Sequence, residues 1–334
     1  MRVEPSAGSQ RTVAPERNLP PSVSAVVLTY RRPRLATDVV RSLLEEERFT
    51  PDRIIVVVNG SGGLDDPALE SRVRLVRLPH NLGPAGGFSA GIEEAFSDRE
   101  VHWAYLCEDD VGLFALPSPR VADVMDRTER YEALSDRPIG TVVAYGRRFV
   151  GRGAHTVNVV PPAGEPYELS PVDVASWGAT LLSRRVFDAG VLPDPTWFFG
   201  LEDFDYFCRV RREGFDVLVD SRSAREVVDQ QTSTGRVGAH APYRPTDESE
   251  TWRSYYHARN SVTLARRHGR PSWHLWHLAY TGRHLQKATG NSQRRAILHG
   301  LWDGVRGRDG ENPRYGRSVG EYVIDPDEPG PGAE

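Results

Sequence analysis

Continuous apolar runs alternate with helical repeats of apolar residues in the first third of the chain, and no other feature limits the fold as strongly. Residues 23–28 and 54–58 are rich in β-branched side chains and contain no charge. Such runs are typical of strands that are buried on both faces of a sheet. Between them, Leu35, Val39 and Leu43 recur at helical spacing. Repeated strand–helix–strand units with short connections predict an α/β fold with a mostly parallel sheet flanked by helices.

This pattern predicts an α/β domain over residues 22–249. Its first half, residues 22–111, alternates regularly, and we expect it to bind a nucleotide. Residues 112–249 alternate less regularly and form the second half. We expect further strands at residues 73–78, 101–107, 172–182 and 217–219, and helices at residues 88–96, 121–134 and 203–212.

The composition changes beyond the α/β domain. Residues 251–320 hold thirteen Arg or Lys against three Asp or Glu, so their charge is +10 and the rest of the chain carries −14. They also contain six of the ten histidines and four of the seven tryptophans. We therefore predict a basic, aromatic-rich helical extension over residues 250–320, with a flexible lead at 1–21 and a flexible acidic tail at 321–334.

Charge and composition exclude several classes of protein. A formal net charge of −4 argues against a general nucleic-acid binder. Cys107 and Cys208 cannot make a disulfide framework and have no zinc-site spacing, which favours a reducing cytosol. No apolar run approaches the roughly 18 residues of a spanning helix, and the N-terminus has no apolar stretch typical of a secretory signal. We expect a cytoplasmic protein.

Polar residues follow the first two predicted strands. Thr29, Tyr30 and Arg31 come directly after the first strand, and Asn59 ends the second. Ligands of open α/β sheets bind beyond the carboxyl ends of the strands. A hydroxyl, an aromatic ring, a guanidinium and an amide there could contact a nucleoside and its phosphates. Ordinary turn chemistry explains the same residues equally well.

A glycine-rich segment follows the third predicted strand. It runs from Asn81 to Phe88 and contains Gly86 and Gly87. Glycines let the backbone approach a ligand closely, and a helix start offers N–H groups to an anion. The segment is neither a Walker A loop nor a dinucleotide fingerprint. A structural glycine turn remains an alternative.

Three consecutive carboxylates, Glu108, Asp109 and Asp110, follow the fourth predicted strand. Adjacent negative charges are unfavourable unless a positive group relieves them. Mg²⁺ or Mn²⁺ prefers oxygen ligands and would serve this purpose. Alternate residues of an extended segment point the same way, so Glu108 and Asp110 would face one metal and Asp109 would face elsewhere. The alternative is a solvated acidic loop.

A second acidic cluster contains Glu202 and Asp203, which lie among the aromatic residues of the 197–206 segment. Partial burial raises the pKa of a carboxyl group and suits a general base. The same residues would also be favourable at a helix N-terminus, so both interpretations can hold together.

Five segments match a known family in order and spacing. They are VVLTYRRP, VVVNG, NLGPAGGF, CEDD and FFGLEDFDYFCRVRREG. Together they resemble the family 2 glycosyltransferases of GT-A fold. The likeness is greatest to the galactofuranosyltransferases that initiate galactan synthesis, followed by rhamnosyltransferases that use dTDP-rhamnose. It covers residues 23–220, and YYHARNSV at 255–262 resembles a segment that follows the core in the same group.

The resemblance implies a role for each matching position. Asp203 would be the catalytic base, with Glu202 beside it, and Glu108 and Asp110 would hold the metal, Glu108 replacing the usual first Asp. A metal-binding histidine of the family is missing here, and Asp229 or His240 would take its place. The donor would contact Thr29, Tyr30, Arg31, Asn59, Asn81, Gly86, Gly87 and Asp109. Trp177, Gly178 and Trp197 would shape the acceptor side.

The implied reaction is inverting transfer of a sugar from a nucleotide-diphosphate donor to an acceptor hydroxyl. A metal on the diphosphate would stabilise the leaving group, and one base on the opposite face would deprotonate the acceptor. The donor would be of the UDP-galactofuranose or dTDP-rhamnose type. The acceptor would be a glycan, a lipid-linked glycan or a small molecule. Alternatives are a natural-product glycosyltransferase with another donor and a catalytically silent nucleotide-sugar-binding or scaffold protein. A nucleotidyltransferase is disfavoured, because residues 29–33 lack the glycine-rich loop that follows the first strand of such enzymes.

The helical extension suggests peripheral contact of residues 251–306 with the inner face of the plasma membrane. Aromatic and basic side chains alternate there, as on helices that bind anionic lipid. The side chains concerned are Trp273, Leu275, Trp276, Leu278, Tyr280, Arg283, Lys287, Arg294 and Arg295. In the alternative interpretation, the aromatic residues pack on the core and the arginines pair with its acidic side chains.

Overall fold

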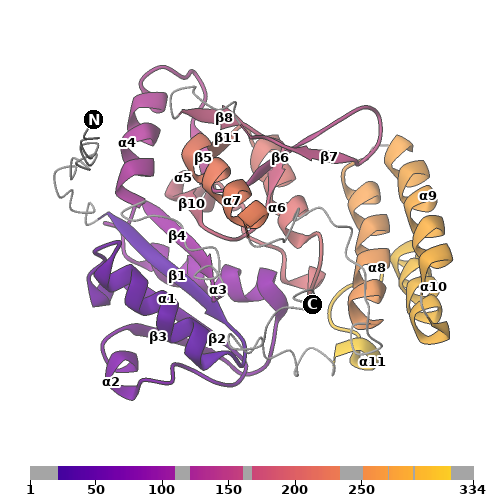
Figure 1. Cartoon of the computed structure of the whole chain (residues 1–334), viewed down its shortest axis with the longest axis horizontal. Helices are drawn as coiled ribbons and strands as arrows, with labels where there is room; N and C mark the ends of the chain where they lie inside the picture. Colours follow the sequence, from indigo (N-terminus) through magenta and orange to yellow (C-terminus); the bar gives the residue numbers. More distant parts are fainter. Residues whose placement is uncertain are drawn as a thin grey trace, which may run out of the picture.

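The chain folds into an α/β domain followed by a group of helices at one side (Figure 1). A computed structural model describes residues 22–109, 121–160, 168–233, 251–269, 271–288 and 290–316. The expected α/β fold class is confirmed: a mixed, mostly parallel sheet lies between helices and is followed by a helical C-terminal extension, which is consistent with the GT-A fold.

The central sheet has eight strands in the order β3-β2-β1-β4-β10-β5-β11-β8. They are β1 (Val23–Thr29), β2 (Ile54–Asn59), β3 (Arg74–Leu78), β4 (Trp103–Glu108), β5 (Ile139–Val143), β8 (Leu169–Pro171), β10 (Thr180–Ser183) and β11 (Asp216–Asp220). Strands β3, β2, β1 and β4 are parallel neighbours. Strand β10 runs antiparallel to β4 and β5, and β8 runs antiparallel to β11. The carboxyl ends of the first four strands therefore meet at one edge of the sheet.

Helices cover both faces of this sheet, because side chains alternate between the faces along each strand. Ala25 and Val27 of β1 belong to a core with α1 (Pro33–Glu45), α2 (Pro67–Glu70) and α4 (Val121–Glu132). Val26 and Leu28 belong to the opposite core. The helices there are α3 (Gly83–Ser97), α5 (Arg184–Asp188), α6 (Glu202–Arg212) and α7 (Ser221–Ser233).

Two expected elements differ from the observed ones. Helix α3 begins at Gly83 rather than at residue 88, so Gly86 and Gly87 lie inside its first turns. The strand expected at 172–182 is divided into β9 (Val174–Ala175) and β10, because Trp177 and Gly178 form a turn in which Ala179 has a φ of 54°. Strand β9 belongs to a smaller sheet with β6 (Gly146–Phe149) and β7 (Thr156–Asn158).

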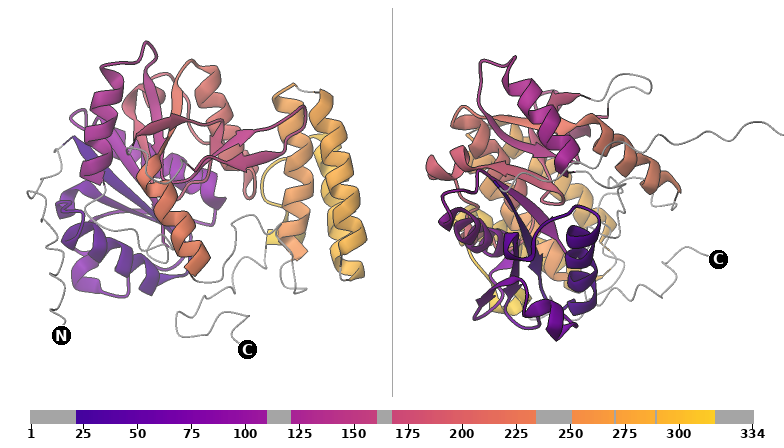
Figure 2. Two further views of the ribbon diagram at one scale, coloured as in Figure 1. Left: turned by 45° about the horizontal axis from the view of Figure 1, so that its top comes forward. Right: turned by 90° about the vertical axis from the view of Figure 1, so that its left-hand side faces the viewer.

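The predicted extension consists of α8 (Thr251–Arg267), α9 (Pro271–Lys287), α10 (Asn291–Arg306) and the short α11 (Pro313–Gly316). Helix α8 lies between the α/β domain and the other two long helices (Figure 2). The turn between β6 and β7 reaches α9, where a Cβ at Gly153 would lie 2.5 Å from the ring of Trp276. None of the described helices is long and apolar enough to cross a membrane.

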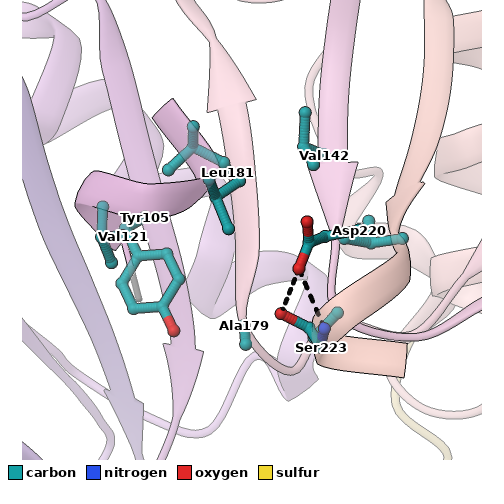
Figure 3. Close-up of a pocket in the computed structure, with 10 residues that line it drawn as sticks. Tyr105, Val121, Val142, Ala179, Leu181, Asp220 and Ser223 are labelled. Atoms are coloured by element: carbon teal, nitrogen blue, oxygen red, sulfur yellow. Dashed lines mark hydrogen bonds between the residues drawn. The ribbon is translucent and has the colours of Figure 1, made fainter. Parts of the chain in front are cut away.

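A buried ion pair joins α4 to the end of β11. Asp220 accepts a hydrogen bond from Arg127 Nε at 2.6 Å, and both side chains are buried. The Asp220 carboxylate also accepts from the backbone N–H and the hydroxyl of Ser223 at 2.9 and 2.7 Å, as Figure 3 shows. The adjoining cavity of about 10 Å³ has room for one water molecule at most. Asp220 therefore holds α4 and α7 against the sheet.

Replacing Asp220→Ala should lower the free energy of unfolding by about 3–5 kcal/mol, because the Arg127 charge would stay buried without its partner. The matched control is Asp123→Ala, which removes a partly exposed ion pair with Arg222 and should cost less than about 1 kcal/mol. Urea denaturation measures both values. Equal losses in the two variants would show that burial of the Arg127 pair is unimportant.

Candidate active site

The ends of β1 and β4 are joined by side-chain contacts. The Thr29 hydroxyl donates to Asp109 Oδ2 at 2.9 Å, and Arg32 Nε donates to the same oxygen at 3.0 Å. Asp109 is 1% exposed. Its carboxylate is therefore engaged by its own chain, and Arg32, which the sequence analysis did not single out, is its cationic partner. A role of Asp109 and Thr29 toward a donor would act through this contact.

Asn59 holds the glycine-rich segment beside the end of β2. Its Oδ1 accepts from Leu82 N at 2.8 Å, and its Nδ2 donates to the Gly83 carbonyl at 3.0 Å. Asn81 Oδ1 in turn accepts from Gly83 N at 2.8 Å. The two asparagines expected near the donor are thus brought together, and their amides shape the turn that begins α3.

Tyr30 and Arg31 lie at the same edge. A Cβ at Gly60 would be 3.1 Å from Asn81 N and 3.6 Å from the Tyr30 ring, so these segments are in contact. The Arg31 guanidinium lies 5.3 Å from the centre of the Tyr30 ring, and its Nε donates to Ser61 Oγ at 3.2 Å. Arg31 is exposed. An exposed cation beside an aromatic ring is suited to the phosphates and base of a nucleotide.

The glycines at the start of α3 permit close packing within the protein. A Cβ at Gly87 would lie 2.3 Å from Leu28 Cδ1, and a Cβ at Gly86 would lie 2.5 Å from Leu82 Cβ. Both residues are buried. The contact of Gly86 and Gly87 with a donor stays a prediction, because the small size of Gly87 is already needed against Leu28 of β1 and that of Gly86 against Leu82.

Gly83 brings the second acidic cluster to this edge. Its φ is +71°, and a Cβ there would lie 1.7 Å from the Phe198 carbonyl oxygen. Residues 197–201 precede α6 in an irregular loop, in which Phe198, Gly200 and Leu201 have φ values of 58°, 78° and 66°. The loop and the start of α3 are thus in direct backbone contact.

Glu202 begins α6 and is 7% exposed. Burial, followed by the charges of Asp203 and Glu108, raises its pKa well above the ordinary 4.5. The Trp177 side chain opposes this shift, because it donates a hydrogen bond to the Glu202 carboxyl group. Burial and the two neighbouring charges outweigh that contact.

Glu108 is half-buried at the end of β4. Alternation along the strand puts it on the face of Ala104 and Leu106, which α3 and α6 cover. Its charge also raises the pKa of Glu202. The charges of the two acidic groups, which are about ninety residues apart in sequence, therefore interact near one edge of the sheet.

Asp203 is half-buried, and burial raises its pKa to about 6. Two groups oppose this effect: the N–H of Phe204, which donates to Oδ1 at 2.8 Å, and the charge of Arg147. Arg147 of β6 lies 5.8 Å from the Phe204 ring. No local pattern in the sequence pointed to Arg147, because the residues that it approaches are more than fifty positions away. Asp203 combines partial access with a pKa near neutrality, as a general base requires.

The third acid of the cluster has a different environment. Asp205 is fully buried, and it accepts from Arg209 Nε at 2.9 Å and from Arg267 at 3.1 Å. Burial raises its pKa, but the His268 contact and the two arginines lower it below its ordinary value. Asp205 therefore anchors α6 to the end of α8 and is not a candidate base.

The candidate metal ligands are only partly described. Asp110 and His240 lie outside the described residues, and Asp229 is exposed on α7. No group of three or more His, Cys, Asp or Glu residues in the described part could hold a metal ion. Glu108 is therefore the described residue that would contribute to a metal site, and its carboxylate is of the oxygen type that Mg²⁺ and Mn²⁺ prefer.

The expected acceptor residues are mostly internal. Trp177 is 3% exposed, and its ring centre lies 5.0 Å from that of Phe88 and 5.1 Å from that of Tyr206. Trp197 is also buried, whereas Gly178 is half-buried in the turn before β10. The two tryptophans pack behind the acidic cluster, so a role toward an acceptor stays a prediction that would act through the position of the acids.

Helix α8 holds the loop that presents the acids. Asn260 Nδ2 lies 3.2, 2.6 and 2.8 Å from the carbonyl oxygens of Trp197, Phe199 and Gly200. Arg259, which is 1% exposed, donates to the Trp197 carbonyl at 2.8 Å. These two residues belong to the YYHARNSV segment, whose likeness to the family was noted but whose partners could not be read from the sequence. We call them the loop clamp.

The N-terminal part of the α/β domain matches a known protein family. Residues 24–138, about a third of the chain, match the family described as "Glycosyl transferase family 2". This segment is similar to the glycosyltransferases of that family. The match agrees with the resemblance seen in the motifs but does not distinguish galactofuranosyl from rhamnosyl transfer. No curated protein matches the sequence of the chain.

Two solved glycosyltransferase structures share limited similarity with the chain. The structure of GalNAc-T7 with UDP, GalNAc and Mn²⁺ is 14% identical, and the match covers 60% of this chain and 42% of that one, with a TM-score of 0.46. The mannosyltransferase PcManGT from Pyrobaculum calidifontis, in complex with GDP-Man and Mn²⁺, is 16% identical over 89% and 90% of the two chains, with a TM-score of 0.39. The chain thus spans less than half of GalNAc-T7.

Replacing Asn260→Ala should lower the free energy of unfolding by about 1–3 kcal/mol, because buried carbonyl groups would lose their donor. It should also speed hydrogen exchange at the amides of residues 199–205. Asn291→Ala, at an exposed position of α10, is the control and should change stability by less than about 0.5 kcal/mol. Unchanged exchange at the loop in Asn260→Ala would contradict the clamp.

Asp203 should make stability fall as the pH rises. A folded-state pKa of about 6 against an ordinary 3.8 means that the native state binds the proton more tightly than the unfolded state does. Between pH 4 and 6 the wild type should lose about 1–3 kcal/mol relative to Asp203→Asn. Urea denaturation across this range tests it, with the exposed Asp52→Asn as control. A difference that does not grow with pH would refute the raised pKa.

Proposed function

We propose that the chain is a glycosyltransferase that moves a sugar from a nucleotide-diphosphate donor to an acceptor hydroxyl. The supporting observation is the interaction between the charges of two acidic groups near one sheet edge. Glu108 ends β4, and Glu202 and Asp203 begin α6. The first group lies in the segment similar to family 2 glycosyltransferases. Sugar transfer requires two functions: stabilisation of the leaving group and deprotonation of the nucleophile. Two separate acidic groups can divide these functions between them.

The donor would lie along the ends of β1 and β2. Arg31 and Tyr30 would face its nucleoside and phosphates, while Asn59 and Asn81 hold the turn beneath. Glu108, with Asp110 and with Asp229 or His240, would hold Mg²⁺ or Mn²⁺. A divalent ion bound there would stabilise the negative charge of the departing diphosphate.

The acceptor hydroxyl would be deprotonated by Asp203. A hydroxyl has a pKa far above neutrality, so it needs a base as it attacks the anomeric carbon. A base on the face opposite the diphosphate gives a single displacement with inversion. Glu202, whose pKa is raised well above 4.5, is too deeply buried to reach an acceptor and would support Asp203 from behind.

The finer assignments also belong to this proposal. The motif resemblance favours UDP-galactofuranose or dTDP-rhamnose as donor and a glycan, a lipid-linked glycan or a small molecule as acceptor, and hence a role in cell-wall or polysaccharide synthesis. We place the enzyme in the cytoplasm. A contact through the C-terminal helices would hold it at the membrane surface.

A second candidate function is binding of a nucleotide sugar without catalysis. It is favoured by one observation: the metal motif is irregular, because Glu108 stands where the resembling enzymes have their first Asp. A silent binder would still be stabilised by its ligand. At a ligand concentration of 100 times Kd the gain is about 2.7 kcal/mol, so a thermal-shift panel of nucleotide sugars with and without Mn²⁺ detects binding in either case.

Catalysis is tested by Asp203→Asn. The variant should lose about 10²–10⁴-fold in kcat, because the acceptor would keep its proton, while its thermal shift with the donor should remain. EDTA should abolish transfer by the wild type, and Asp52→Asn should behave like the wild type. Normal turnover by Asp203→Asn would exclude it as the base. Donor binding without transfer or donor hydrolysis by the wild type would favour the silent binder.

A further inference from the structure

Exposed apolar side chains gather on the two outer helices. Eight large hydrophobic residues of the described chain are exposed, and five of them lie on α9 and α10. They are Leu275 and Leu278 on α9, and Leu298, Trp302 and Val305 on α10. Scattered single residues of this kind need no explanation, but a cluster on one part of the surface marks an interaction site. We call these five residues the outer patch.

The spacing within α10 puts its three members on one side. Leu298, Trp302 and Val305 follow the i, i+4, i+7 pattern of a single helical face. The opposite side carries Gly300 and Gly304, where a Cβ would lie 2.2 and 2.6 Å from backbone carbonyl oxygens of α8. The apolar side of α10 therefore points away from α8.

Helix α9 contributes at the same height. Helices α9 and α10 are joined by a short connection and run antiparallel. Residues 275–278 precede this connection by about as many positions as residues 298–305 follow it, so the two segments lie at the same level along the helix pair. Leu285 and Leu301 of the two helices share one small core with Ala258. The exposed leucines of α9 thus lie at the level of the apolar side of α10.

This surface corrects the residues expected to contact a membrane. Trp273 is 1% exposed and packs 4.7 Å from the Phe149 ring, so it belongs to the core. Trp276 and Tyr280 are half-buried and stack on each other at 5.0 Å. The aromatic residues of α9 therefore face inward, whereas Leu275 and Leu278 face outward.

The charge around the outer patch is positive. Helices α9 and α10 contain one acidic residue, Asp303, which is fully buried and bonded to Tyr255. Their basic residues are Arg283, Lys287, Arg294, Arg295 and Arg306, all of which are exposed. The Arg306 guanidinium lies 4.1 Å from the ring centre of Trp302, so a cation and an aromatic ring share one surface site. These two helices therefore have no exposed carboxylate that would repel an anionic partner.

We propose that the outer patch and its surrounding cations bind the surface of an anionic lipid bilayer. Apolar side chains that enter the interface and cations that meet lipid phosphates are the two components of such binding. A second copy of the chain is a less suitable partner, because copies that met face to face through the patch would bring two sets of five cations together. The proposed contact is peripheral, because it uses exposed side chains of helices that pack on the protein.

The proposal would place the active site at a fixed distance from the membrane. Helix α8 carries the loop clamp on one side and packs against α10 on the other. The outer helices and the acid-bearing loop are therefore parts of one packed unit. If the proposed function is correct, a lipid-linked acceptor is the class of substrate that this arrangement favours.

Sedimentation of the full chain with vesicles tests the membrane surface. The vesicles are phosphatidylcholine alone, or phosphatidylcholine with about a third phosphatidylglycerol, an anionic lipid. We expect binding to the anionic vesicles that weakens with salt. Replacing Leu298→Ser together with Trp302→Ser should remove most of it, and Arg294→Gln should weaken it about fivefold, the factor for about 1 kcal/mol.

Matched controls lie on the α/β domain. Leu134→Ser changes a leucine that is 90% exposed, and Arg130→Gln removes an exposed cation of α4. Both should bind vesicles like the wild type. Circular dichroism and thermal melting confirm that each variant is folded.

Three outcomes would overturn the proposal. They are no binding to anionic vesicles, equal binding by patch and control variants, and a dimer in sedimentation equilibrium that Leu298→Ser and Trp302→Ser convert to monomer. Transfer to a soluble acceptor, assayed without vesicles, should be unchanged in the patch variants. Loss of vesicle binding with intact transfer, and loss of transfer with intact binding, therefore distinguish failure of the membrane surface from failure of the proposed function.

Discussion

The site depends on how the backbone of residues 197–201 is satisfied. This loop has three residues with positive φ and cannot use the hydrogen-bond ladder of a helix or a strand. Buried carbonyl groups without donors are costly. Asn260 and Arg259 of α8 supply those donors. The extension is therefore part of the active-site architecture, because it holds the loop from which Glu202 and Asp203 emerge.

The acids of α6 show how position divides chemical roles among similar side chains. Asp205 is neutralised by Arg209 and Arg267 and joins α6 to α8. Glu202 is buried, and its burial and the charge of Asp203 disfavour its charged form. Asp203 lies between these extremes, near Arg147 and with partial access. Three carboxyl groups within one turn thus become an anchor, a support and a candidate base. Only the last has the access that a reaction with an external hydroxyl requires.

Much of the fold was predictable, because the apolar runs of the first four strands are long and the parallel topology brings their ends together. The contacts between Thr29 and Asp109 and between Asn59 and Gly83 follow from that convergence. The start of α3 was not predictable, because glycines usually disfavour helices. Here their small size lets the helix approach β1.

Contacts between distant segments were also beyond sequence reasoning. Asn260 is some sixty residues from the loop that it holds, and Arg147 is equally remote from Asp203 in sequence. Composition revealed that α9 is aromatic and basic but not which side of the helix faces solvent. The rotation of α9 about its own axis determines which side chains face solvent. In this orientation Trp273 is buried and Leu275 is exposed. The extension therefore has two functional faces that its composition alone could not separate.

The most direct test is a crystal structure of the full chain with Mn²⁺ and a nucleoside diphosphate, with the metal located by its anomalous scattering. If the two acidic groups serve one reaction, the manganese will lie between the diphosphate and Glu108. The nucleoside will then lie beside Tyr30 and Asn59, and Asp203 will face the position of the transferred sugar. A metal bound elsewhere, or a nucleotide remote from the ends of β1 and β4, would contradict the proposed site.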